Sequence, residues 1–217
     1  MIGSLEERKV FEEIQKKLFY MIPEKWESIH FYAAIIEQPF KKPLGEMYFY
    51  YYPKGILKKD PINVYEIPAL FNIDEQNYNE LIDKLYKDIR KLRTIAENKH
   101  PNLWSNITIT ISNCKFRIEY DYSDLSGDDV FTDYERHVIW RYKNLDIDLD
   151  LETKQDRYII SKYLDYIKKI KNNSIARKVK IADLKHNSDL TRLDIITEYD
   201  LERKAKYTKA LEILLND

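Results

Sequence analysis

The stretch "SNITITISNCKFRIEYDYSD", residues 105–124, carries the clearest fold signal in this chain of 217 residues. Apolar and polar residues alternate on both sides of Ser112, with Ile107, Ile109 and Ile111 before it. A period of two is typical of a strand that buries one face, and a polar pair between two such runs is typical of a hairpin. The stretch therefore predicts an antiparallel β-hairpin.

The segments before and after this hairpin extend it into a mixed fold. Residues 28–38 and 45–55 are rich in aromatic and β-branched side chains, so they predict a second pair of antiparallel strands. Apolar residues at helical spacing predict helices at residues 4–21, from residue 74 onward, and at residues 130–145. The expected fold class is α+β, with an antiparallel sheet of about four strands and packed helices in the order α-β-β-α-β-β-α.

The sequence pattern changes after this first part. Residues 149–156 alternate acidic and aliphatic side chains without a helical period, and they are interpreted as a linker between a domain at 1–148 and a helical segment at 157–217. Three helices are expected there, at residues 158–171, 174–187 and 197–215.

Charge divides along the chain in a similar way. Residues 1–150 hold 21 Lys and Arg against 26 Asp and Glu, a net charge of −5, whereas residues 151–217 hold 15 against 11, a net charge of +4. No apolar run approaches the roughly 18 residues of a membrane span, and charge appears before any signal-peptide core could form. We therefore expect a cytoplasmic protein that does not interact with membranes.

The helical segment contains "ARKVKIADLKHNSDLTRL", residues 176–193. This stretch resembles the C-terminal end of small HD-superfamily proteins of the kind described as guanosine polyphosphate hydrolases or synthetases. In that superfamily the Asp of the K-x-A-D-x-x-H-N pattern, here Asp183, is one metal ligand. The other ligands are an upstream His and a neighbouring His-Asp pair.

The rest of that metal site is missing from the sequence. None of the four histidines is followed by Asp, and residues 151–178 contain no His. Metal-assisted hydrolysis needs several oxygen and imidazole ligands on one cation. We therefore expect no metal, no cofactor and no enzymatic activity, and interpret Asp183, His186 and Asn187 as part of a polar network that holds the helices together. A phosphohydrolase remnant or nucleotide-binding regulator is the alternative.

Three motifs in the first part are typical of a known family. They are "MIPEKW" at residues 21–26, "LWSN" at 103–106 and "FRIEYDYSDL" at 116–125. In order and spacing, residues 1–148 resemble the YezG/EsaG-type immunity proteins of Gram-positive bacteria. The resemblance implies a cytoplasmic antitoxin that binds the nuclease domain of a cognate polymorphic (LXG) toxin exported by type VII secretion. It implies no cofactor and no catalytic residues.

An acidic segment suggests where such a toxin would bind. Nucleases hold nucleic acid through basic clefts, so an acidic surface suits an inhibitor, and interleaved aromatic residues supply anchors. Residues 119–135 contain seven acids in seventeen positions. The expected toxin-binding residues are Glu119, Asp121, Tyr122, Asp124, Asp128, Asp129, Phe131, Asp133 and Tyr134.

Two readings of this acidic segment stay open. The acids could instead cap a helix or lie on a solvated strand face, as charge runs often do.

The net negative charge of residues 1–150 favours a protein partner over direct binding of nucleic acid. The sequence leaves open whether the protein forms a homodimer.

Overall fold

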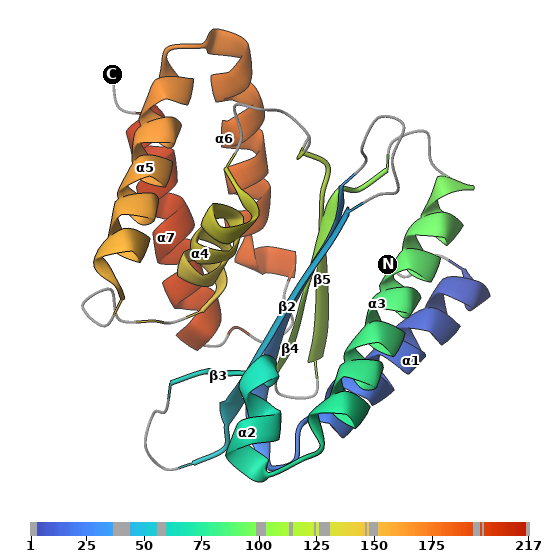
Figure 1. The fold of residues 1–217 in the computed structure, drawn as a ribbon. Coiled ribbons are helices and arrows are strands. Elements are labelled where there is room, and N and C mark those ends of the chain that lie inside the picture. Colours follow the sequence, from blue (N-terminus) through green and yellow to red (C-terminus); the bar gives the residue numbers. More distant parts are fainter. Residues whose placement is uncertain are drawn as a thin grey trace. The chain divides into compact units, whose positions relative to one another are not determined.

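The computed structural model describes residues 4–36, 44–55, 60–98, 103–112, 115–123, 125, 131–145, 147, 152–192, 196 and 198–215. The chain forms two compact units, unit 1 (Met1–Val130) and unit 2 (Phe131–Asp217). Figure 1 shows a sheet with helices in unit 1 and helices alone in unit 2. None of the described helices is both long enough and apolar enough to cross a membrane.

Unit 1 contains a five-stranded antiparallel sheet with strand order β3-β2-β1-β4-β5. Helices α1 and α3 lie side by side along one face of this sheet (Figure 1). The elements of unit 1 are α1 (Leu5–Met21), β1 (Trp26–Ile36), β2 (Leu44–Pro53), β3 (Ile62–Asn63), the 3-10 helix η1 (Val64–Glu66), α2 (Ile67–Phe71), α3 (Glu75–Glu97), β4 (Asn106–Ser112) and β5 (Lys115–Asp121).

The main core lies between the sheet and the two long helices. Phe31 of β1 is opposite Phe49 of β2 and Ile109 of β4, and all three side chains are buried. Ile14 of α1 and Leu85 of α3 join the same core. The alternation seen in the sequence therefore sets the face, because every second residue of a strand points to the same side.

The expected hairpin is confirmed as β4 paired with β5, with Ile109 opposite Ile118. The α+β class and the antiparallel sheet are confirmed as well. The sequence did not reveal β3 or α2, because β3 has two residues and α2 has five. Elements this short show no measurable period, and the prolines nearby are typical of a loop.

Unit 2 is a helical unit with its own core. Val138 of α4 packs with Ile160 and Ile167 of α5, Leu184 of α6 and Leu214 of α7. The elements of unit 2 are α4 (Asp133–Asn144), α5 (Lys154–Lys171), α6 (Ser174–Ser188), the 3-10 helix η2 (Leu190–Arg192) and α7 (Glu198–Leu215).

The compact units differ from the expected domain limits. The sequence pattern placed α4 at the end of a domain at 1–148, whereas contacts place it in unit 2, where Val138 and Ile139 enter the helical core. The expected linker at 149–156 ends inside a helix, because α5 begins at Lys154. Apolar spacing revealed that α4 has a buried stripe but not which core receives it.

We expect truncation in the sheet core to lower stability strongly. Ile109 is fully buried between β1 and β5, so Ile109→Ala should lower the free energy of unfolding by about 2–5 kcal/mol, since a cavity remains. The control Ile109→Val should cost only about 0.5–1.5 kcal/mol. Denaturant unfolding followed by circular dichroism measures both, and equal effects would contradict tight packing at this position.

Candidate partner-binding surface

Three of the expected toxin-binding residues lie at the end of β5. Glu119 is 4.0 Å from Arg117 on the same strand. Asp121 accepts a hydrogen bond from the Ser123 amide at 2.7 Å, which orders the chain after the strand. Tyr122 is 60% exposed. These residues therefore combine negative charge with an exposed aromatic ring on unit 1.

Asp133, Tyr134 and Phe131 lie at the start of α4. Asp133 is exposed in the first turn, behind a capping box formed by Thr132 and Glu135. A carboxylate in the first turn stabilises the positive end of the helix dipole. The alternative reading, in which an acid of this segment supports a helix start, therefore holds for Asp133.

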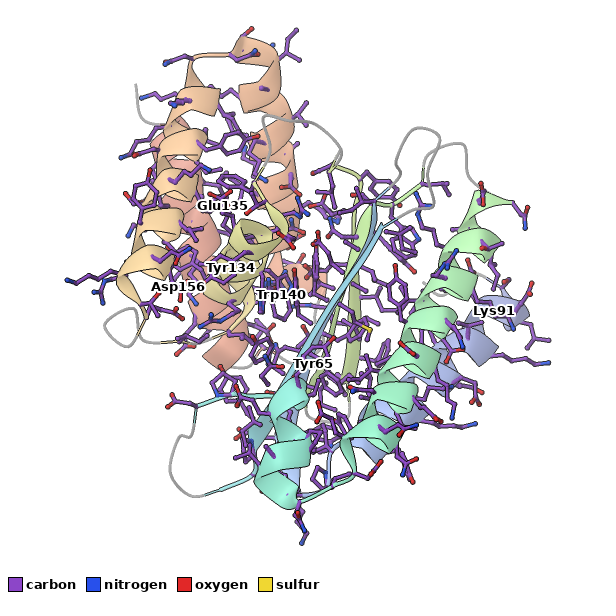
Figure 2. All side chains as sticks on the ribbon, viewed as in Figure 1. Tyr65, Lys91, Tyr134, Glu135, Trp140 and Asp156 are labelled. Carbon is purple, nitrogen blue, oxygen red and sulfur yellow. The ribbon has the colours of Figure 1, made fainter. Side chains whose placement is uncertain are left out.

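The two aromatic residues of this part make contacts within unit 2. Tyr134 donates a hydrogen bond from its hydroxyl to Asp156 Oδ1 at 2.6 Å, and Figure 2 labels both residues. The Phe131 ring lies 5.5 Å from Tyr166 and 6.2 Å from Tyr163. Because these contacts use the ring of Phe131 and the hydroxyl of Tyr134, the two side chains are less available as anchors than Tyr122.

The expected residues are thus divided between the two units. Asp124, Asp128 and Asp129 lie outside the described residues, and the limit between the units follows directly at Val130 and Phe131. From the sequence, residues 119–135 were predicted to form one continuous surface. Their role in toxin binding remains a prediction.

A buried cluster of charges joins α4 to the start of α5. Arg141 Nη2 donates to Glu152 Oε1 at 2.5 Å, and Arg141 Nη1 lies 3.9 Å from Asp156 Oδ2. Burial raises the pKa of Glu152. Burial also acts on Asp156, but hydrogen bonds from Glu152, Tyr134 and Thr153, with the charge of Arg141, hold the pKa of Asp156 below its usual value. The sequence did not reveal this cluster, because Glu152 and Asp156 lie in or next to the stretch without helical period that was interpreted as a linker.

His137 is a partly buried titratable group beside that cluster. Burial and the nearby charge of Arg141 lower its pKa to about 4, against the opposing effect of Asp156. The imidazole is therefore neutral at neutral pH. This follows from its position on α4, where protonation would place a second cation next to Arg141.

Asp183, His186 and Asn187 lie on α6, and the contacts described for Asp183 run within that helix. Asp183 accepts hydrogen bonds from Asn187 and from Lys180, both at 2.9 Å. Arg177 on the same helix makes a contact between helices, since it donates to the Leu214 carbonyl of α7 at 2.6 Å. The role of Asp183, His186 and Asn187 in holding the helices together remains a prediction. Among the described residues, no three His, Cys, Asp or Glu side chains converge as metal ligands.

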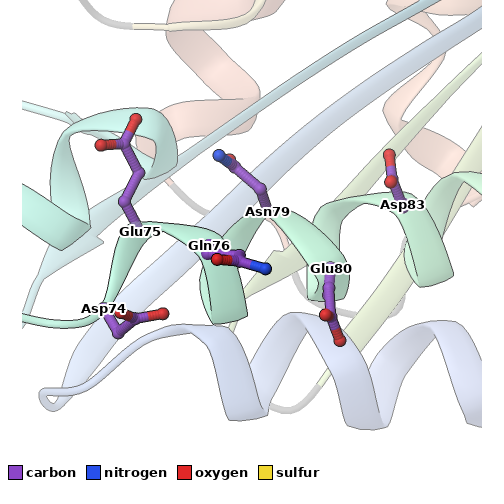
Figure 3. Close-up of a pocket in the computed structure, with 6 residues that line it drawn as sticks. All are labelled: Asp74, Glu75, Gln76, Asn79, Glu80 and Asp83. Carbon is purple, nitrogen blue, oxygen red and sulfur yellow. The ribbon is translucent and has the colours of Figure 1, made fainter.

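An acidic surface at the start of α3 was also missed. A shallow pocket there is lined by Asp74, Glu75, Gln76, Asn79, Glu80 and Asp83 (Figure 3). Residues 60–83 contain six acids and neither Lys nor Arg. The excess of acids is visible in the sequence, but the helical spacing of this segment indicates only which side chains are buried. It does not show that the acids gather on one surface.

The sheet, α2, α3, α4 and all but the first three residues of α1 fall within a match to a known family. Residues 8–159 match the family model described as "Immunity protein YezG-like", which is more than half of the chain. The chain belongs to the YezG-like immunity protein family. The resemblance expected from the three sequence motifs is therefore confirmed.

Individual relatives agree with this assignment. The chain is 29% identical over 148 residues to the immunity protein YezG of Bacillus spizizenii, covering 68% of this chain and 87% of the relative. It is 26% identical over 162 residues to the immunity protein YezG of Bacillus subtilis, covering 71% and 97%. It is also 26% identical over 141 residues to the type VII secretion system protein EsaG of Staphylococcus aureus, covering 64% and 81%.

The family match covers only part of this YezG-like chain and indicates the kind of protein it is. The family is one of immunity proteins and not of enzymes, as the sequence analysis expected. The family model ends at residue 159, inside α5, so α6 and α7 lie beyond it. The comparisons give no support for the resemblance of residues 176–193 to HD-superfamily proteins.

We expect the stability of this protein to decrease as pH falls from 6.5 to 5. His137 has a pKa of about 4 when folded and 6.5 in its ordinary state, so the unfolded chain binds more protons across this window. The stability contributed by neutral His137 is present above pH 6.5 and is lost as pH falls toward 4. Denaturant unfolding should show a loss on the order of 1–2 kcal/mol by pH 5.

Matched histidine variants isolate this effect. His137→Gln should flatten the pH profile relative to the unchanged protein, whereas His186→Gln, at an exposed position of α6, should not. Glu152, whose pKa is raised, acts with the opposite sign, so the comparison between variants is the informative one. An unaltered slope in His137→Gln would contradict a partly buried neutral imidazole.

Proposed function

We propose that this immunity protein binds the nuclease domain of a cognate toxin exported by type VII secretion and neutralises it in the cytoplasm of the producing cell. Membership of the YezG-like immunity family is the observation that carries the proposal. The relative EsaG, named as a type VII secretion system protein, supports the secretion route. Toxin binding, rather than catalysis, is the proposed activity.

Electrostatics supports a nuclease as the partner. Nuclease domains attract phosphate through basic clefts, and a negative protein surface that covers such a cleft is drawn to it and excludes nucleic acid. Residues 1–150 carry a net charge of −5 from 21 bases and 26 acids. Complementary charge raises the association rate, while buried apolar and aromatic contacts set the lifetime of the complex.

The end of β5 is proposed as one part of the contact. Glu119 and Asp121 supply negative charge there, and Tyr122 offers an aromatic ring that is mostly in solvent. Tyrosine is enriched among interface residues that dominate affinity. On unit 2, Asp133 of α4 is an exposed acid that is proposed as a separate part of the contact.

Titration of nuclease activity tests the proposal directly. The cognate toxin is sought among the genes that adjoin this one. Its purified C-terminal domain should cleave nucleic acid, and the full-length chain should abolish cleavage at a near-equimolar ratio. An equal amount of heat-denatured chain serves as the control. Full cleavage at a large excess of native chain, with no complex on a sizing column, would overturn the proposed partner.

A tyrosine variant tests the proposed contact at β5. Tyr122→Ala should weaken inhibition about tenfold, because loss of an interface aromatic anchor typically costs more than 1 kcal/mol. Tyr20→Ala, which truncates an exposed tyrosine on α1, is the matched control and should leave inhibition unchanged. Identical inhibition curves for the two variants would remove Tyr122 from the toxin contact.

A further inference from the structure

Unit 1 exposes an apolar surface where α2 meets α3. Every residue from 69 to 77 is exposed, and this run includes Leu70 at 57%, Phe71 at 37% and Ile73 at 36%. Tyr65, in the 3-10 helix just before α2, is 47% exposed. Single exposed apolar residues are common, but four large ones within nine positions are characteristic of a binding surface.

The backbone holds this surface in a defined shape. Asn72 ends α2 in the left-handed conformation, with φ of 50°, and its amide donates to the Pro68 carbonyl. Two residues later, Asp74 caps α3 by accepting a hydrogen bond from the Asn77 amide at 2.8 Å. The chain between the two helices is therefore fixed at both ends, which limits the entropy lost on binding.

Tyr65 is anchored from the other side. Its hydroxyl donates to the Met47 carbonyl of β2 at 2.9 Å, so the aromatic ring is held against the sheet while part of it stays in solvent. Burial, followed by the charge of Asp83 on α3, raises the pKa of Tyr65. The exposed run 69–77 contains the apolar residues Leu70, Phe71 and Ile73 together with the acids Asp74 and Glu75, so apolar and acidic side chains adjoin along the chain here.

The charge around this apolar surface is mainly negative, and one of its acids, Glu80, pairs with Lys84 at 3.6 Å. Figure 3 shows the side chains of Glu75, Asn79 and Asp83 pointing to the same side of α3. Glu75 and Asp83 make no ion pair among the described residues. Because residues 60–83 hold six acids without a single Lys or Arg, the surface is suited to a partner with a basic face.

We propose that Tyr65, Leu70, Phe71, Ile73, Glu75 and Asp83, called here the α2–α3 corner, form a docking surface for a basic face of the toxin's nuclease domain. This inference rests on the proposed function and names the surface that makes first contact. The apolar side chains anchor the complex, and the acids steer the encounter. Tyr122 at the end of β5 would add a second contact of the same unit.

The charge also disfavours other occupants of the α2–α3 corner. A second copy of this chain would bring carboxylates against carboxylates across a twofold interface, which is repulsive. Nucleic acid and anionic membrane surfaces would meet the same negative field. A basic protein surface gains both from charge neutralisation and from burial of Leu70 and Phe71.

Binding kinetics of the full-length chain test the inference. The immobilised probe is the C-terminal domain of the cognate toxin, and the variants are Leu70→Ser and Asp83→Lys. Leu5→Ser, at an exposed position of α1, is the control for Leu70→Ser. Glu97→Lys, at the far end of α3, is the control for Asp83→Lys, since it makes the same change of charge. Circular dichroism of each variant checks that the fold is kept.

The two corner variants should differ in which rate they change. Leu70→Ser should raise the dissociation rate about tenfold, because it removes an apolar anchor. Asp83→Lys should lower the association rate by about threefold to tenfold at low salt, and this difference should shrink as salt is added. Both control variants should bind like the unchanged chain.

Each other outcome overturns the inference in a recognisable way. If the unchanged chain binds and the corner variants match the controls, the α2–α3 corner is excluded while the proposed function stands. If the unchanged chain does not bind the probe, both fail together. If sedimentation shows that Leu70→Ser disrupts a dimer of this chain without changing toxin binding, a second copy occupies the corner instead.

Discussion

Burial of one face of the antiparallel sheet against α1 and α3 is the constraint on which unit 1 depends. Phe31, Phe49 and Ile109 lie next to one another across three strands and are almost completely buried. Each large apolar side chain removed from water contributes about 1.5–3 kcal/mol, and a shift of one residue in a strand would turn the core side chains of that strand to the opposite face of the sheet. The register of the sheet follows from this packing.

Unit 2 differs from unit 1 because charged side chains are buried within it, and the cost of burying them must be offset by pairing. Arg141 bridges Glu152 and Asp156, and Tyr134 donates to the same aspartate. Buried charges are tolerated only where each is paired and hydrogen-bonded. Burial, with the charge of Arg141, keeps His137 neutral. The contacts of Glu152 and Asp156 also explain why residues interpreted as a linker belong to an ordered helix start.

Two parts of the chain, the α2–α3 corner and the segment 119–135, combine acidic side chains with apolar or aromatic ones. An inhibitor needs fast capture, which negative charge provides, and slow release, which requires exposed apolar groups on a rigid support. At the α2–α3 corner four exposed apolar residues lie within nine positions, and Asn72 and Asp74 hold the backbone there. In the segment 119–135, by contrast, Phe131 and Tyr134 are engaged within unit 2.

The sequence by itself determined the fold class, the central hairpin and the family, because strand alternation and ordered motifs are local properties of the chain. Tertiary structure alone decided which core receives α4, whether Glu152 and Asp156 are buried, and that the segment 119–135 spans two units. Spacing shows that a helix has an apolar face, but only long-range packing selects the partner of that face. The exposure of Leu70 and Phe71 was likewise hidden, because apolar residues are expected inside a protein until the fold leaves them outside.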